Sequence, residues 1–158
     1  MSESVKAILD AIRADQLEDV TQLIQQQPDM VNQADERGFT PLIMAAYFNR
    51  FEIVQLLVEN GAQINEVDGS GNTALMGAVF KAYPEIVEFL LENGASVYSK
   101  NYNGANVMTY AASYGTPDII ELLVKAGADA TVKDNKGMTA IDYAKKQGNT
   151  VFLEAVGQ

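Results

Sequence analysis

The sequence predicts an all-α solenoid of stacked helix-turn-helix units whose tips are short β-turns or hairpins. A short phrase recurs every 33 residues, as GFTPLIMAA (38–46), GNTALMGAV (71–79), GANVMTYAA (104–112) and GMTAIDYAK (137–145). A second amphipathic segment follows each of the first three copies, and a glycine ends it. Neither apolar stripe can be buried within one unit, so we expect similar units to stack against one another.

A tight turn is predicted at the start of each unit. The glycine that opens the phrase tolerates positive φ, which such a turn needs. These glycines are Gly38, Gly71, Gly104 and Gly137. Three residues earlier stand short polar side chains that can bond the backbone of their own turn. They are Asp35, Asp68, Asn101 and Asp134.

The first helix of each unit is predicted to begin two residues after the glycine. The residues there have a side-chain oxygen that can cap a helix. They are Thr40, Thr73, Asn106 and Thr139. Pro41 follows Thr40 at a position where its missing N–H is tolerated. Leu42 and Ala45 lie three apart on one face, and the small alanine lets a neighbouring helix approach.

The second helix is predicted from an apolar stripe, for example Ile53, Leu56 and Leu57 in FEIVQLLVEN (51–60). The segments PEIVEFLLEN (84–93) and PDIIELLVKA (117–126) repeat the pattern, and Thr116 can cap the second of them. A glycine suited to the left-handed conformation ends each helix. These glycines are Gly61, Gly94 and Gly127.

The phrase T-P-L-x-x-A-A, with G-A-x-x-N after the second helix, resembles the ankyrin repeat. Residues 38–65 are a close match, and the resemblance extends over nearly the whole chain. It implies a single ankyrin-repeat domain over residues 1–158. Its parts would be an N-terminal capping repeat (1–34), three internal repeats (35–67, 68–100 and 101–133) and a C-terminal capping repeat (134–158).

Two departures from the family pattern bear on stability. The histidine that usually follows T-P-L is absent, and its hydrogen bonds must be replaced by packing or by other groups. The residues at this position are Ile43, Met76, Thr109 and Asp142. The copy with Asn106, Val107 and Met108 in place of T-P-L matches least well. We therefore expect residues 101–133 to form the least stable internal repeat.

The composition argues against several classes of protein. The chain has no histidine and no cysteine, so it lacks the commonest general base and metal ligand. Its net charge of −10 disfavours nucleic acid and anionic lipid, and no apolar run is long enough to span a bilayer. The segment DGSGN (68–72) begins like a calcium loop but lacks its glycine and final glutamate. We expect a cytoplasmic, non-enzymatic protein without catalytic residues, metal or cofactor.

The resemblance implies that the chain binds another macromolecule through a concave groove lined by turn tips and first helices. By register, the partner-binding residues would be Glu36, Arg37, Phe39, Tyr47, Phe48, Ser70, Asn72, Phe80, Lys81, Tyr102, Asn103, Ser113, Tyr114, Lys136 and Met138. The six aromatic residues among them would form a strip of the kind found in binding hot spots. We expect Phe48, Tyr102 and Tyr114 to be exposed. For Tyr47 and Phe80, exposure and half-burial against the neighbouring repeat are equally consistent with the pattern.

Net charge changes steadily along the chain, from −4 in residues 1–34 to 0 in residues 134–158. In a solenoid, order in the sequence is order in space, so the N-terminal end should be the more acidic. This gradient either orients a basic partner or simply keeps the chain soluble, and we favour the second reading.

Three functions remain open on the sequence alone. The first is a monomeric module that binds a protein partner, and one form of it is an inhibitor or immunity-type protein that occludes a toxin or enzyme. The second is a small-ligand-binding or enzymatic protein on the same scaffold, which needs a pocket with convergent polar groups. The third is self-association through the aromatic strip, which light scattering over a range of concentrations would detect.

Overall fold

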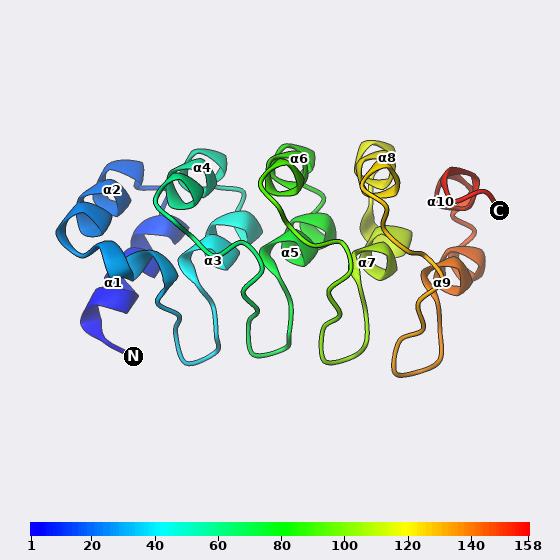
Figure 1. Ribbon diagram of the computed structural model, residues 1–158, viewed down its shortest axis with the longest axis horizontal. Helices are drawn as coiled ribbons and strands as arrows, with labels where there is room; N and C mark the ends of the chain where they lie inside the picture. Colours follow the sequence, from blue (N-terminus) through cyan, green and yellow to red (C-terminus); the bar gives the residue numbers. More distant parts are fainter.

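The computed structural model describes all 158 residues, in ten α-helices and one 3₁₀ helix with no strand. The helices form consecutive pairs that stack along one axis, with the second helices in one row and the first helices in another (Figure 1). Their bounds are α1 Glu3–Arg13, α2 Leu17–Gln26, η1 Pro28–Asn32, α3 Pro41–Tyr47, α4 Phe51–Glu59, α5 Ala74–Lys81, α6 Pro84–Glu92, α7 Val107–Tyr114, α8 Pro117–Lys125, α9 Ala140–Gln147 and α10 Thr150–Ala155. The predicted all-helical solenoid is confirmed.

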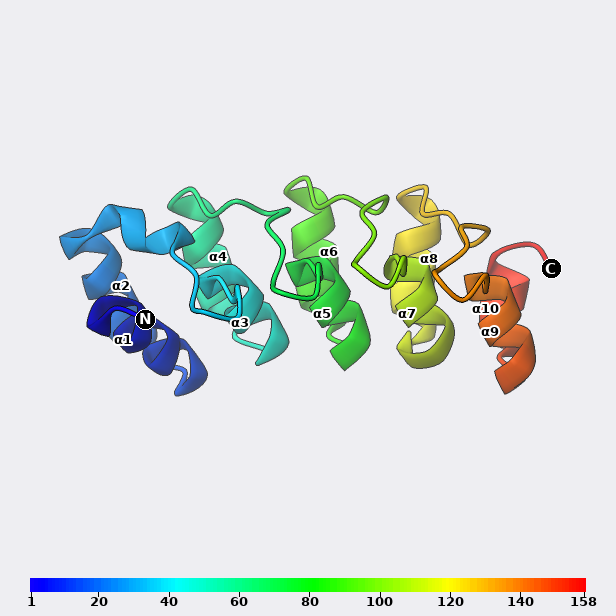
Figure 2. The ribbon, with the colours of Figure 1, turned by 90° about the horizontal axis from the view of Figure 1, so that it is seen from below.

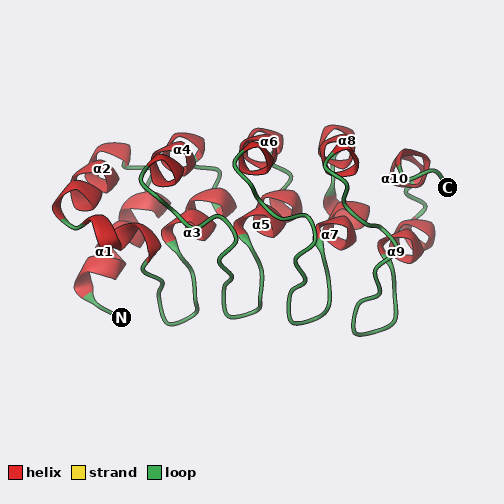
Figure 3. Ribbon diagram, viewed as in Figure 1, coloured by secondary structure: helices red, strands yellow, loops and turns green.

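The tips are loops that project from the rows of helices (Figure 3). In the first loop, Oδ1 of Asp35 accepts hydrogen bonds from the backbone N–H groups of Arg37 and Phe39, both at 2.9 Å. Gly38 closes the turn with a φ of +81°. The corresponding residues of the later loops repeat these bonds. The predicted turn chemistry is therefore present in every loop.

Adjacent loops are joined by a single backbone hydrogen bond at each step. Gly69 N–H donates to the carbonyl of Arg37 at 2.8 Å, and Tyr102 N–H donates to that of Ser70 at 3.0 Å. Asn135 N–H completes the series by donating to the carbonyl of Asn103 at 2.9 Å. These bonds keep the loops in register above the first helices.

The predicted caps are confirmed, and they account for the positions where the family has histidine. Thr40 accepts from the N–H of Ile43 at 3.1 Å, and Ile43 itself is buried. In the last two repeats the side chains of Thr109 and Asp142 bond back to the cap backbone and complete capping boxes. Packing thus replaces the histidine in two repeats, and capping replaces it in the other two.

The core lies between the two rows of helices and continues from one end of the stack to the other. Figure 2 shows the pairs as a regular array seen from below. Ile53, Ile86 and Ile119 are fully buried at the same position of successive second helices, and Phe152 occupies that position in α10. None of the helices has the length and apolar character needed to cross a membrane.

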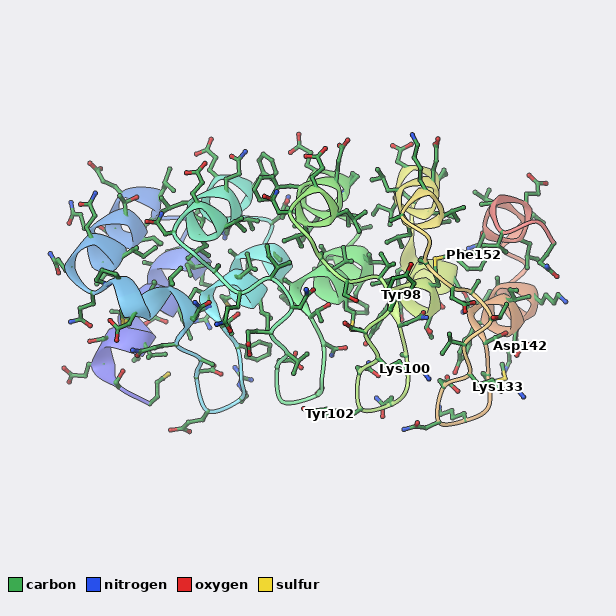
Figure 4. The ribbon with its side chains drawn as sticks, in the orientation of Figure 1. Tyr98, Lys100, Tyr102, Lys133, Asp142 and Phe152 are labelled. Carbon is green, nitrogen blue, oxygen red and sulfur yellow. The ribbon has the colours of Figure 1, made fainter.

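Asparagine side chains bridge the first two junctions between connectors. Asn32 donates to the carbonyl of Gly61 at 3.1 Å and accepts from Gln63 N–H at 2.8 Å. Asn65 makes the same pair of bonds to Gly94 and Ser96, at 3.2 and 2.8 Å. At the third junction this position is Tyr98, whose exposed side chain projects from the connector after α6 (Figure 4). The amide bridge is therefore missing between residues 68–100 and 101–133.

Replacing Tyr98 by asparagine is expected to stabilise the protein. The new amide would bond the Gly127 carbonyl and the Asp129 N–H, and two net hydrogen bonds are worth about 1–2 kcal/mol. Urea unfolding followed by circular dichroism measures the change. Tyr98→Ser is the matched control, since it removes the ring without adding the amide. Equal stability of the two variants would contradict the expectation.

Candidate functional site

A cavity of about 490 Å³ lies on the groove face of α3 and α5, and we call it the groove pocket. Seven residues of the predicted partner-binding set line it. They are Arg37, Phe39, Tyr47, Phe48, Ser70, Asn72 and Phe80. The volume falls within the range of small-ligand sites, and eight of the fifteen lining residues are hydrophobic. The structure thus gathers about half of the predicted set around one hollow.

The other predicted residues lie at its border or outside it. Lys81 and Tyr114 border the pocket through contacts with Tyr47 and Phe80 respectively. Ser113 accepts a hydrogen bond from Gln147 Nε2 at 2.7 Å, on the face of α7 and α9. The remaining ones belong to loop tips, where Met138 is half-buried and the others are exposed. They are Glu36, Tyr102, Asn103, Lys136 and Met138.

Glu36 is held by a contact of its own at the first loop tip. Its Oε1 accepts from the N-terminal ammonium of Met1 at 2.8 Å. This hydrogen bond and the positive charge lower the pKa of Glu36 below its ordinary value. Both groups are exposed to solvent, so the ion pair contributes little to stability.

Four of the six aromatic residues of the predicted strip pack in two clusters, one of which also includes Tyr110. Phe80 packs against Tyr114 and Tyr110 with ring centroids 4.8 and 6.0 Å apart, and Tyr47 packs against Phe48 at 5.5 Å. Phe39 belongs to neither cluster, and nor does Tyr102. The side chain of Tyr102 is 66% exposed at the tip of its loop (Figure 4).

The expected exposure of Phe48 is wrong. Phe48 follows the last residue of α3 as its C-cap, and its ring is half-buried between Tyr47 and the guanidinium of Arg13. The expected exposure of Tyr102 and Tyr114 is confirmed. Tyr47 and Phe80 are 40% and 37% exposed, so each presents part of its ring while the rest packs on a neighbour.

Three cations lie over aromatic rings around the groove pocket. Arg37 is 5.1 Å from the centroid of Phe39, and Lys81 is 5.1 Å from that of Tyr47. Arg13, from the end of α1, is 5.8 Å from that of Phe48. Such cation–π contacts orient long side chains at an exposed site. The rim of the pocket therefore carries three cations, of which Arg13 is paired with Asp10 at 3.1 Å, and the carboxylate of Asp68 also lines the pocket.

A polar network closes one end of the groove pocket. The hydroxyl of Tyr110 donates to Oδ1 of Asn72 at 2.9 Å and accepts from Nδ2 of Asn101 at 3.0 Å. Asn101 also donates to Asn72 at 2.9 Å. Burial raises the pKa of Tyr110, so its hydroxyl remains a donor at neutral pH. Asn72, a predicted contact residue, lines the pocket, and its side-chain oxygen accepts the bonds from Tyr110 and Asn101.

Most of the net negative charge lies on the second helices, away from the groove. Nine exposed acidic residues and a single basic residue, Lys125, occupy α2, α4, α6 and α8. The acidic ones are Glu18, Asp19, Glu52, Glu59, Glu85, Glu88, Glu92, Asp118 and Glu121. The second helices therefore carry most of the excess of acidic over basic residues. No three acidic side chains gather closely enough to hold a metal ion.

Eight residues that line the groove pocket were not in the predicted set. They are Arg13, Ile43, Met44, Asp68, Thr73, Met76, Gly77 and Tyr110. Three of them, Met44, Gly77 and Tyr110, belong with Tyr143 to one column that the 33-residue period aligns. Comparing the four residues of this column would have revealed that one repeat lacks a side chain there. Arg13 carried no such signal, because residues 1–34 contain no copy of the turn phrase.

Comparison with known families gives two matches. A model described as ankyrin repeats in three copies matches residues 8–101, and one described as ankyrin repeats in many copies matches residues 90–144. The first alone covers more than half of the chain. No curated protein matches the sequence.

Proposed function

Because this chain belongs to the ankyrin-repeat family, we propose that it binds a protein partner through the concave groove formed by its turn tips and first helices. Ankyrin repeats generally mediate protein–protein interaction, and the family is typically a non-enzymatic interaction module. The observation that carries the choice of face is the groove pocket, where partly exposed aromatic rings surround a hollow of about 490 Å³.

The composition of this face supports the proposal. Aromatic residues and arginine dominate binding hot spots because they bury large areas and retain polar contacts. Tyr47, Phe80 and Tyr114 supply the rings here, and Arg13 and Arg37 supply the guanidinium groups. Because most of the net negative charge lies on the second helices, away from the groove, we do not propose a basic partner. A neutral or acidic partner segment fits the cations around the pocket better.

Capture from a lysate of the source cells tests the choice of face. We expect the triple variant Tyr47→Ser, Phe80→Ser and Tyr114→Ser to lose a partner that the unchanged chain retains. Removing even one hot-spot residue weakens binding by about 30-fold or more. Tyr98→Ser is the matched control, because it removes an aromatic residue that is 69% exposed and lies outside the groove. Circular dichroism confirms that each variant folds.

The same experiment separates the alternatives. A partner retained by the triple variant would place the site on another face of the protein. Capture of an enzyme or toxin that loses activity on binding would identify the inhibitor or immunity-type form of the proposal. Recovery of the chain itself would favour self-association, which a concentration series by light scattering then checks.

A further inference from the structure

The backbone conformation does not explain why residue 77 is a glycine. It lies inside α5, and its φ is not positive. A β-carbon built on it would have only one neighbour within 4 Å, Cδ2 of Tyr47 at 3.8 Å. Glycine inside a helix is less favourable than alanine. The residue therefore weakens its own helix while leaving space above it unfilled.

The other repeats fill this space with a side chain. The same column holds Met44, Tyr110 and Tyr143. The hydroxyl of Tyr143 donates to Oδ2 of Asp134, which stands nine residues earlier in its own turn. Tyr110 bonds Asn101 across the same interval of nine residues. A tyrosine at this position thus reaches the first residue of its repeat's turn.

The repeat that contains Gly77 has the aspartate that could accept a tyrosine's hydrogen bond, but it has no tyrosine to donate one. Asp68 stands nine residues before Gly77. Its Oδ1 accepts from Ser70 N–H at 2.8 Å and from Asn72 N–H at 3.0 Å, as the turn requires. Its Oδ2 makes no hydrogen bond within the protein, and the residue lines the groove pocket.

We propose that the groove pocket receives a tyrosine side chain of the partner protein, whose hydroxyl donates to Oδ2 of Asp68 in the space that Gly77 leaves open. The ring would lie among Tyr47, Phe80 and Tyr110, which line the pocket. That the phenol comes from a tyrosine of a partner protein rests on the proposed function. That the pocket prefers a phenol is independent of the proposed function.

Charge favours a neutral donor over a cation. The guanidinium groups of Arg13 and Arg37 line the same pocket, and the ammonium of Lys81 lies over Tyr47 at its border. An incoming lysine or arginine would be repelled by Arg37 and Lys81, whereas the charge of Arg13 is partly balanced by Asp10. A phenylalanine would cover the carboxylate of Asp68 without bonding it, which is unfavourable for a charged group. Tyrosine combines an aromatic ring with an uncharged donor.

Titration with amino-acid amides, followed by NMR of the ¹⁵N-labelled protein, tests the preference directly. N-acetyltyrosinamide is expected to shift the amide signals of Gly77 and Asp68 to saturation. N-acetylphenylalaninamide should bind about tenfold more weakly, because it lacks the hydroxyl. Absence of saturable shifts, or equal affinity for the two amides, would overturn the inference.

Substitutions of Gly77 provide the second test. Gly77→Tyr places the phenol of this protein's own chain in the pocket and should abolish binding of N-acetyltyrosinamide. It should also raise the urea midpoint above that of the unchanged chain. Gly77→Ala adds only a β-carbon and should still bind. Gly77→Met, which copies Met44, is a second blocking variant in case the tyrosine variant does not fold. Unchanged binding in a folded blocking variant would refute the proposal.

The two proposals fail separately. If the groove triple variant loses the partner while Gly77→Tyr keeps it, the partner uses the groove but places no tyrosine in the pocket. If the amide titration succeeds and no partner is captured, the pocket accepts a phenol and the proposed function loses its support.

Discussion

Replacing Gly71 by alanine is expected to destabilise the protein by about 2–5 kcal/mol. Gly71 has a φ of +81°, which is unfavourable for any residue with a β-carbon. An added β-carbon would also lie 2.8 Å from the backbone nitrogen of Tyr102 and 3.0 Å from Cα of Asn101. The substitution would thus push the next loop away and disturb the bond between Tyr102 N–H and the Ser70 carbonyl, which spans 3.0 Å.

Gly137→Ala is the matched control for this prediction. Gly137 stands at the same position of the last loop with a φ of +76°, and a β-carbon there would meet nothing within 4 Å. It should therefore lose only about 1–2 kcal/mol, from the backbone conformation alone. Urea unfolding of both variants, followed by circular dichroism, isolates the contact between loops. Equal losses would show that the loops do not support one another.

The features that sequence reasoning predicted correctly depend on short stretches of chain. A cap such as Thr40 acts on an amide three residues away, and a turn aspartate such as Asp35 acts within four residues. The 33-residue period then repeats each local solution. Because every unit must bury its stripe on its neighbours, the stack follows from the units themselves.

The features that sequence reasoning misjudged or did not describe depend on contacts between repeats. Phe48 lies past the end of α3, so the helical period no longer describes where its ring points, and Arg13 from another unit covers it. Asn72 occupies a tip position, but Tyr110 and Asn101 of the following repeat engage its side chain. Sequence spacing alone does not identify such contacts, because the residues in contact stand at different positions of the 33-residue repeat.

The distribution of charge could also be predicted only in part from the sequence. Because residue order is stacking order, the sequence does predict that net charge changes along the solenoid. It does not by itself say which side of the stack carries the charge. The structure places most of the free carboxylates on the second helices, whereas those of Asp35, Asp68, Asp134 and Asp142 bond the backbone of turns and caps. The groove is consequently less acidic than the net charge of the chain suggests.

Replacing Phe152 by alanine is expected to destabilise the C-terminal repeat by about 3–5 kcal/mol, the usual loss for a buried phenylalanine. Its side chain is fully buried, and α10, which carries it, packs on α8 and α9. Three smaller side chains, Ile53, Ile86 and Ile119, serve the corresponding position in longer helices. With only Thr150–Ala155 to cover the end of the stack, the larger ring compensates for a shorter helix.

The loss should remain local, because each unit of a solenoid contacts only its neighbours. We therefore expect amide hydrogens of α9 and α10 to lose most of their protection against exchange while those of α3 and α5 keep theirs. Val151→Ala is the matched control in the same helix, since Val151 is 46% exposed and its truncation should change stability by less than about 0.5 kcal/mol. Protection lost evenly along the chain would instead mean that all five units unfold together, and that the C-terminal repeat stabilises the whole stack.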